Sequence, residues 1–188
     1  AVTEGYIEID LFTSMPLTIN NKALSDAINE KYDATEDNLI SLVKTMNSKY
    51  SGEQIIVSYS YNVTRLGKYL TEEESTYVYV NGEEEPKYSL NQSVRKVYDE
   101  KTGKEVTLSD LFKEGTDYRA ELLQAIKTLR NEWWGYETFN DETYLEIIDN
   151  GDLMLYQNAL EITYEYPDGT YEYCNIPFEY LDQAALTI

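Results

Sequence analysis

The stretch DYRAELLQAIKTLRNEWW, residues 117–134, is the strongest indication of fold in this 188-residue chain. Its apolar residues recur every three or four positions, a spacing that places them on one face of an α-helix. Asp117 stands where a residue that caps the first helical turn is favoured. We therefore predict a long helix whose apolar stripe packs on a sheet and consists of Tyr118, Leu122, Ala125, Ile126, Leu129 and Trp133.

The part of the chain before this helix shows both strand and helix patterns. Alternating apolar and polar residues, or runs of β-branched and aromatic residues, are typical of strands. Apolar residues three or four positions apart, with acidic residues in the first turn, are typical of helices. These patterns predict strands at 5–12, 54–63, 76–80 and 88–98, helices at about 21–32 and from 35 to about 50, and a polar connection at 65–75.

Two β-hairpins are expected after the long helix. Asn150-Gly151 and Pro167-Asp168-Gly169 are turn sequences, and Asn-Gly is a strong hairpin signal. Helix and strand patterns do not alternate regularly, which argues against a doubly wound parallel sheet. The predicted hairpin strands are 143–148 with 153–157, and 160–166 with 170–176.

The predicted fold class is therefore α+β, an antiparallel sheet with a long helix packed on one face and two C-terminal β-hairpins. The length of 188 residues suits a single domain. We expect this domain to combine an N-terminal part of strand and helices at 5–87 with a C-terminal part at 88–181.

The balance of charges restricts the partners of the chain. It contains 35 acidic and 15 basic residues, a formal net charge of −20. Such a surface repels the phosphates of nucleic acids and anionic membranes, and it attracts basic proteins. The alternative is that the charge serves solubility alone. Because of this charge we expect no nucleic-acid partner. No apolar run approaches the roughly 20 residues of a membrane span, so we expect no membrane span in this chain.

Histidine is absent and Cys174 is the only cysteine. Serine triads, cysteine–histidine pairs and HExxH zinc sites are therefore excluded. No spacing of carboxylates selects a glycosidase pair, and residues 149–152 lack the alternating acids of a calcium loop. We predict a protein that is not an enzyme, with no catalytic residue, no metal and no cofactor, and with an unreactive thiol.

Aromatic residues and acidic runs are the candidates for ligand binding. Neighbouring residues of a helix point in different directions, so Trp133 is expected in the core and Trp134 outside it. Trp134 would serve either as a binding anchor or as a lid over the sheet, and Tyr136 nearby is a second candidate for ligand binding. Tyrosine pairs at 59/61, 77/79 and 171/173 each share a sheet face, either beneath helices or exposed to a partner. The densest negative patches are Glu72, Glu73 and Glu74 in the polar connection, and Glu83, Glu84 and Glu85 in a turn.

Residues 97–112, VYDEKTGKEVTLSDLF, resemble a known family signature, D-x-x-T-G-K-x-(V/I)-x-L-x-D-L-F. It belongs to a bacterial extracytoplasmic domain found in RsiV-type lysozyme-sensing anti-sigma factors and in the non-catalytic N-terminal part of PdaC-type peptidoglycan deacetylases. Residues 176–181, IPFEYL, are similar to the close of that domain. The resemblance covers 88–181 and, more loosely, 5–87. A Gly-Ala-His segment of the family is replaced here by Leu66-Gly67-Lys68.

The resemblance implies a function and a location outside the cytoplasm. We expect a cell-envelope binding or sensing module of a secreted or surface lipoprotein from a Gram-positive bacterium, anchored through a segment outside this chain. Its expected partner is a basic, lysozyme-like protein or a cell-wall glycan. The alternative left open is an accessory domain or a carboxylate-based enzyme acting on peptidoglycan or another glycan.

Overall fold

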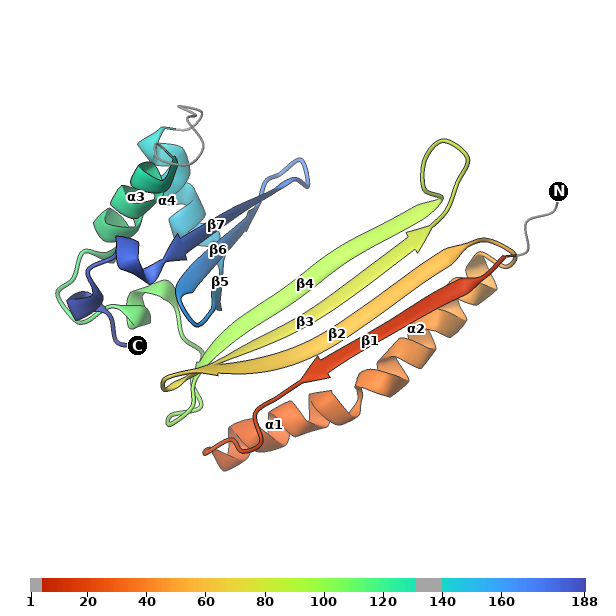
Figure 1. Cartoon of the computed structure of the whole chain (residues 1–188), viewed down its shortest axis with the longest axis horizontal. Helices are drawn as coiled ribbons and strands as arrows, with labels where there is room; N and C mark the ends of the chain where they lie inside the picture. Colours follow the sequence, from red (N-terminus) through yellow and green to blue (C-terminus); the bar gives the residue numbers. More distant parts are fainter. Residues whose placement is uncertain (1–4, 131–139) are drawn as a thin grey trace. The chain divides into compact units, whose positions relative to one another are not determined.

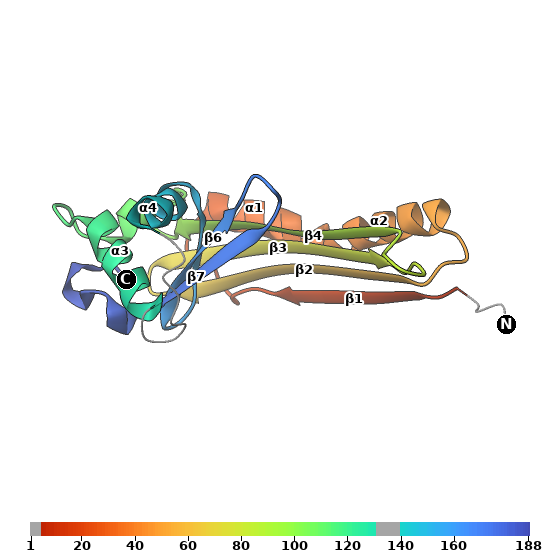
Figure 2. The ribbon, with the colours of Figure 1, turned by 90° about the horizontal axis from the view of Figure 1, so that it is seen from above.

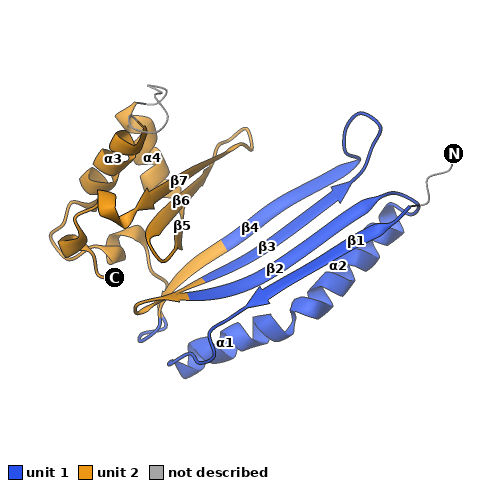
Figure 3. Ribbon diagram, in the orientation of Figure 1, with its two compact units in different colours: residues 1–64, 72–94, 100–103 blue, residues 65–71, 95–99, 104–188 orange. Residues whose placement is uncertain are grey.

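The computed structural model describes residues 5–130 and 140–188 (Figure 1). The chain forms two compact units, and three strands pass from one unit into the other (Figure 3). Unit 1 consists of residues 1–64, 72–94 and 100–103, and unit 2 of residues 65–71, 95–99 and 104–188. The predicted α+β class is confirmed.

The helices α1 (Lys22–Asp33) and α2 (Thr35–Lys49) of unit 1 form where the sequence predicts them. The side-chain oxygen of Asn21 accepts a hydrogen bond from the backbone N–H of Leu24 at 3.0 Å, which caps the first turn of α1. The acidic residues at the start of α2 lie at the positive end of the helix. The buried residues of the two helices include Leu24, Ile28, Leu39 and Met46.

A four-stranded sheet lies against these helices (Figure 2), in the order β1-β2-β3-β4. Its strands are β1 (Ile7–Ser14), β2 (Ile55–Leu66), β3 (Tyr69–Val80) and β4 (Tyr88–Asp99). β2, β3 and β4 follow one another through turns and run antiparallel, whereas β1 pairs with β2 in parallel. The helical crossover between β1 and β2 makes this parallel pairing possible, and the sheet is therefore mixed.

The prediction of a polar connection over residues 65–75 is wrong, because most of these residues belong to β2 and β3. Gly67 and Lys68 alone turn the chain between β2 and β3, and Gly67 adopts a φ of +56°, which glycine tolerates best. The acidic run Glu72–Glu74 therefore lies inside β3. Glutamate is depleted in strands, which is why the sequence pattern did not reveal this one.

Unit 2 contains a three-stranded antiparallel sheet, β5 (Asp152–Leu155), β6 (Ala159–Glu165) and β7 (Tyr171–Pro177), together with α3 (Tyr118–Leu129) and α4 (Asp141–Asn150). The side chain of Asp117 accepts a hydrogen bond from the N–H of Ala120 at 3.1 Å and caps α3, as predicted. Leu122, Ala125 and Ile126 are buried in the core of unit 2 and Leu129 is half-buried, while Trp133 lies outside the described residues.

The strand expected at residues 143–148 is wrong, because these residues form part of α4. Tyr144, Ile147 and Ile148 are buried at helical spacing, and Asn140 caps the helix. Gly151 ends α4 by donating its N–H to the carbonyl of Ile147, so Asn150-Gly151 is not a hairpin turn. Two hairpins do close the chain, but they are β5–β6 and the predicted β6–β7.

Candidate functional site

The two faces of the sheet in unit 1 carry different side chains. Every second residue of β2 is buried, and the residues between them are partly exposed. Because successive side chains of a strand point to opposite faces, one face of the sheet is covered and the other is not. The covered residues are Ile55, Val57, Tyr59, Tyr61 and Val63. Tyr61 and Lys31 of α1 both bind Glu72, so this face lies on the side of the helices.

The covered face holds a hydrogen-bonded network around Glu72. The hydroxyl of Tyr61 donates to Oε2 of Glu72 at 2.6 Å, and Nζ of Lys31 donates to Oε1 at 2.8 Å. The hydroxyl of Tyr59 donates to Glu74 at 2.7 Å, and burial, with this hydrogen bond, raises the pKa of Tyr59 to about 12. Glu72 is only 5% exposed, so its predicted place in an accessible negative patch is wrong.

We call the opposite face of the sheet the open face. Two side-chain hydrogen bonds between neighbouring strands show which residues lie on it. Ser14 donates to Oδ1 of Asn62 at 2.9 Å, and the hydroxyls of Ser75 and Ser93 share a hydrogen bond at 2.7 Å. Within unit 1, strand alternation gives the open face Glu8, Asp10, Phe12 and Ser14 of β1, Ile56, Ser58, Ser60, Asn62 and Thr64 of β2, Glu73, Ser75, Tyr77 and Tyr79 of β3, and Ser89, Asn91 and Ser93 of β4.

None of the residues of the open face is buried, and most of them are small and polar. Phe12 and Tyr77 are 60% and 39% exposed, and rings of this kind serve as anchors in protein interfaces. The charged residues of this face are Glu8, Asp10 and Glu73, and none of its residues in unit 1 is Lys or Arg. Arg95, the next β4 residue on the same side, belongs to unit 2, where it binds Glu161 and Thr163. Small ligands usually bind in concave sites. A sheet face of short hydroxyl and acidic side chains with exposed aromatic rings is better suited to binding a macromolecule.

The open face overlaps the predicted ligand-binding residues only at Glu73. Glu83, Glu84 and Glu85 are exposed in the loop between β3 and β4, and Glu74 lies on the covered face. Trp134 and Tyr136 lie outside the described residues. The sequence prediction missed Glu8 and Asp10 as site residues. The alternation of residues 5–12 already indicated that both lie on one side of a strand. Of the tyrosine pairs, 59/61 is covered by helices, and 77/79 lies on the open face.

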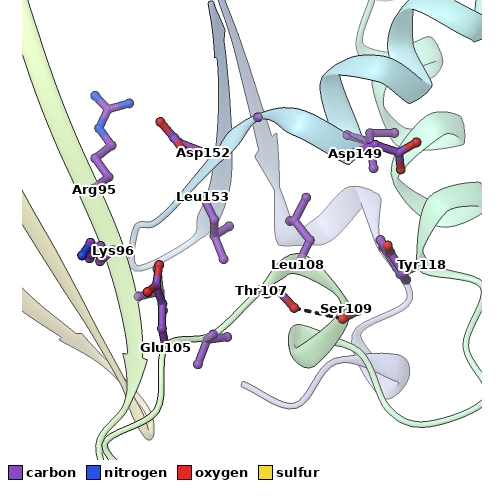
Figure 4. Close-up of a pocket in the computed structure, with 14 residues that line it drawn as sticks. Arg95, Lys96, Glu105, Thr107, Leu108, Ser109, Tyr118, Asp149, Asp152 and Leu153 are labelled. Carbon is purple, nitrogen blue, oxygen red and sulfur yellow. Dashed lines mark hydrogen bonds between the residues drawn. The ribbon is translucent and has the colours of Figure 1, made fainter.

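Unit 2 contains a polar pocket of about 270 Å³ (Figure 4). Arg95 lines one side of it and donates to Oγ1 of Thr163 at 2.5 Å and to Glu161 at 3.3 Å. Asp149 lines the other side and accepts two hydrogen bonds, both 2.9 Å long, from the guanidinium of Arg119. The charges of Arg95 and Asp149 therefore have partners inside unit 2. The pocket is also lined by Glu105, Thr107, Ser109, Tyr118 and Asp152.

The segment that carries the family resemblance has a structural role in unit 2. The backbone N–H of Thr107 donates to the carboxylate of Asp110 at 2.9 Å, which forms a capping box at a short 3-10 helix, Leu108–Leu111. The apolar residues of the signature, Val106, Leu108, Leu111 and Phe112, are buried in the core of unit 2.

Cys174 is buried on β7, and burial raises the pKa of its thiol. A thiol with a raised pKa is protonated near neutral pH, whereas the deprotonated thiolate is the reactive form. The thiol of Cys174 is therefore expected to be unreactive. Among residues 5–130 and 140–188, no group of three or more Cys, Asp or Glu side chains is arranged to hold a metal ion. In the same ranges, no helix has both the length and the apolar character to cross a membrane.

No family model and no curated protein matches this chain. It is similar to the crystal structure of a DUF3298 family protein from Pseudomonas aeruginosa PAO1, with 14% identity and a TM-score of 0.40 over 76% of this chain and 66% of that one. It is also similar to a DUF3298 member from Bacteroides fragilis, with 14% identity and a TM-score of 0.42 over 89% and 69%. The resemblance to the domain of lysozyme sensors and deacetylases stays a prediction from the sequence.

Proposed function

We propose that this chain is a cell-envelope binding or sensing module that docks a basic protein on the open face of unit 1. The observation that carries the proposal is the composition of this face, in which Glu8, Asp10 and Glu73 lie among exposed aromatic rings with no Lys or Arg. A lysozyme-like protein has the required positive charge. In this proposal the module works at the cell surface.

Charge and shape have separate roles in this proposal. The net charge of −20 attracts a basic partner over a distance and raises the rate of encounter. Exposed rings then supply the apolar contact that holds the complex, because a few aromatic residues carry most of the binding energy in a typical interface. Phe12 on β1 and Tyr77 on β3 are the two most exposed rings of the open face.

Removing these two rings is the test of the proposal. Phe12→Ser together with Tyr77→Ser should raise the Kd for the basic partner at least tenfold, since truncating a hot-spot residue costs about 2 kcal/mol or more. The partner is first selected from a panel of immobilised lysozymes and other basic proteins as one whose binding weakens with salt. Binding is then measured by biolayer interferometry.

The matched control is Tyr171→Ser together with Tyr173→Ser, which removes two rings that are 44% and 50% exposed on β7 of unit 2. The two rings stack on each other with their centroids 6.2 Å apart. This variant should bind the partner within about twofold of the unchanged protein, since its rings lie outside the open face. Equal losses in the two variants, or a panel without any salt-sensitive binder, would contradict the proposal.

A second candidate function is an accessory role on peptidoglycan or another glycan, and the pocket of unit 2 favours it. The hydroxyl-bearing residues Thr107, Ser109 and Tyr118 line this pocket together with Glu105 and Asp152, and such groups hydrogen-bond to sugar hydroxyls. Soluble peptidoglycan fragments that shift the amide signals of residues 105–109, and leave the open face unchanged, would support the glycan role against docking of a basic protein.

A further inference from the structure

Strand β1 forms one edge of the four-stranded sheet, and β2 is its neighbour on one side only. The N–H of Ile55 donates to the carbonyl of Tyr6 at 2.9 Å, so the backbone groups of Tyr6 face β2. Successive residues of a strand direct their N–H and C=O groups to opposite sides. The outward groups are therefore those of Ile7, Ile9, Leu11 and Thr13, and no strand among the described residues pairs with them.

This edge lacks most of the features that usually protect an exposed strand, and Glu8 and Asp10 are its only charged residues. The eight residues IEIDLFTS contain no Pro, Gly or Lys, which are common means of blocking an edge. Ile9 and Leu11 lie on the same side of the sheet as Thr13, whose hydroxyl donates to that of Tyr32 in α1 at 3.4 Å. They are nevertheless 49% and 40% exposed, because they lie at the rim. A further strand beside β1 would cover both.

The charges of β1 select the kind of strand that fits. Glu8 and Asp10 lie on the open face, and residues directly opposite one another in neighbouring strands approach to about 4.5–5.5 Å. A second copy of this chain carries the same −20 charge, and antiparallel pairing centred on Ile9 would set Glu8 against Asp10 in both directions. Like charges in that position are destabilising, whereas Lys or Arg is favourable.

We infer that the edge of β1 binds an extended segment of a basic partner as an additional strand. This segment has Lys or Arg at alternate positions, beside Glu8 and Asp10, and apolar residues between them, beside Ile9 and Leu11. Backbone hydrogen bonds supply affinity in this mode of recognition and the alternating side chains supply specificity. The inference rests on the proposed function for its basic partner, and it adds the backbone edge as a contact.

The probe is a fluorescent peptide of four Lys-Val repeats, capped at both ends, with binding followed by anisotropy. Two control peptides carry N-methyl groups on all valines or on all lysines, which removes alternate N–H donors and keeps every charge. One of the two should bind at least tenfold more weakly than the parent peptide. Loss in the valine series indicates antiparallel addition and loss in the lysine series indicates parallel addition.

The protein itself supplies a second readout. Hydrogen exchange of the outward amides of Ile9 and Leu11 should slow at least tenfold when the parent peptide binds. Leu11→Pro removes an outward donor without removing a β1–β2 hydrogen bond, since Pro is tolerated on the solvent side of an edge strand. This variant should lose peptide binding at least tenfold. Leu11→Val keeps the donor and should retain binding.

The outcomes separate this inference from the proposed function. If both N-methylated peptides bind as well as the parent, and the outward amides stay unprotected, the edge inference is overturned and docking on the open face stands. If no peptide binds while the basic protein binds through Phe12 and Tyr77, the edge inference also fails alone. If the edge is protected but the two rings prove unimportant, the edge stands and the proposed function fails.

Discussion

Replacing Ile126 with alanine should lower the free energy of unfolding of unit 2 by about 2–5 kcal/mol, the usual cost of truncating a large aliphatic side chain in a packed core. Ile126 is 2% exposed on α3 and belongs to the same core cluster as Leu122 and Ala125. Removing its side-chain carbons leaves a cavity that the surrounding residues fill only in part. Urea unfolding followed by circular dichroism gives the free energy of unfolding.

The matched control for Ile126→Ala is Gln124→Ala, an exposed position on the same helix. It should change the free energy of unfolding by no more than about 0.5 kcal/mol, as is usual for surface substitutions. If Ile126→Ala and Gln124→Ala proved equally stable, the packing of α3 described above would be incorrect.

Glu72→Ala should destabilise unit 1 by about 1–3 kcal/mol, because it removes the hydrogen bond between the Glu72 carboxylate and the buried hydroxyl of Tyr61. Tyr61 is 0% exposed, and its hydroxyl donates to Glu72. Lys31 also loses its partner, but its side chain is 46% exposed and water replaces the lost contact. The same change at the exposed loop residue Glu84 should cost less than about 0.5 kcal/mol.

A double-mutant cycle identifies the cause of the loss at Glu72. Adding Tyr61→Phe to Glu72→Ala removes the hydroxyl that donated to the Glu72 carboxylate and should recover part of the lost stability, because the two positions are in contact. A Glu72→Ala protein as stable as Glu84→Ala would show that Glu72 is not part of the interior network.

Local patterns predict most helices of this fold well, because each has a periodic apolar face and because α1, α3 and α4 also begin at a capping side chain. Asn21 and Asp117 cap α1 and α3, and the buried residues recur at helical spacing. The same pattern was available for α4 in Tyr144, Ile147 and Ile148. Aromatic and β-branched residues there, with Asn150-Gly151 after them, favoured a strand, and strand propensity is a weak guide when a helical face packs on a core.

The parallel pairing of β1 and the burial of Glu72 are not visible in local sequence. Both depend on contacts between residues far apart in the chain, such as Ile7 with Ile55 and Lys31 with Glu72. A run of three glutamates is normally solvated, and only the partners of Glu72 across the fold make its burial tolerable.

The candidate site was predictable only in part, because strand alternation is a local property and the covering of a sheet face by helices is not. Alternation in residues 5–12 places Glu8 and Asp10 on one side of a strand, and alternation in β3 places Tyr77 and Tyr79 together. Which side of the sheet α1 and α2 cover is a tertiary property, so sequence does not distinguish the covered pair Tyr59 and Tyr61 from an exposed pair.

Matched charge variants test most directly whether a basic protein docks on the open face. Glu8→Gln, Asp10→Asn and Glu73→Gln together remove three negative charges from the open face. Glu83→Gln, Glu84→Gln and Glu85→Gln remove three from the exposed β3–β4 loop. Both triple variants change the net charge equally, so general attraction of a basic partner is reduced by a similar amount in each.

The measurement is the association and dissociation rate of the basic partner from ~0.1 M to ~1 M salt, where the screening length falls from about 10 Å to about 3 Å. The unchanged protein should associate more slowly as salt rises, with little change in dissociation. The open-face variant should bind at least tenfold more weakly than the loop variant at ~0.1 M salt, and this difference should shrink as salt rises. If the loop variant loses as much affinity as the open-face variant, or if neither loses any, the open face is not the docking surface.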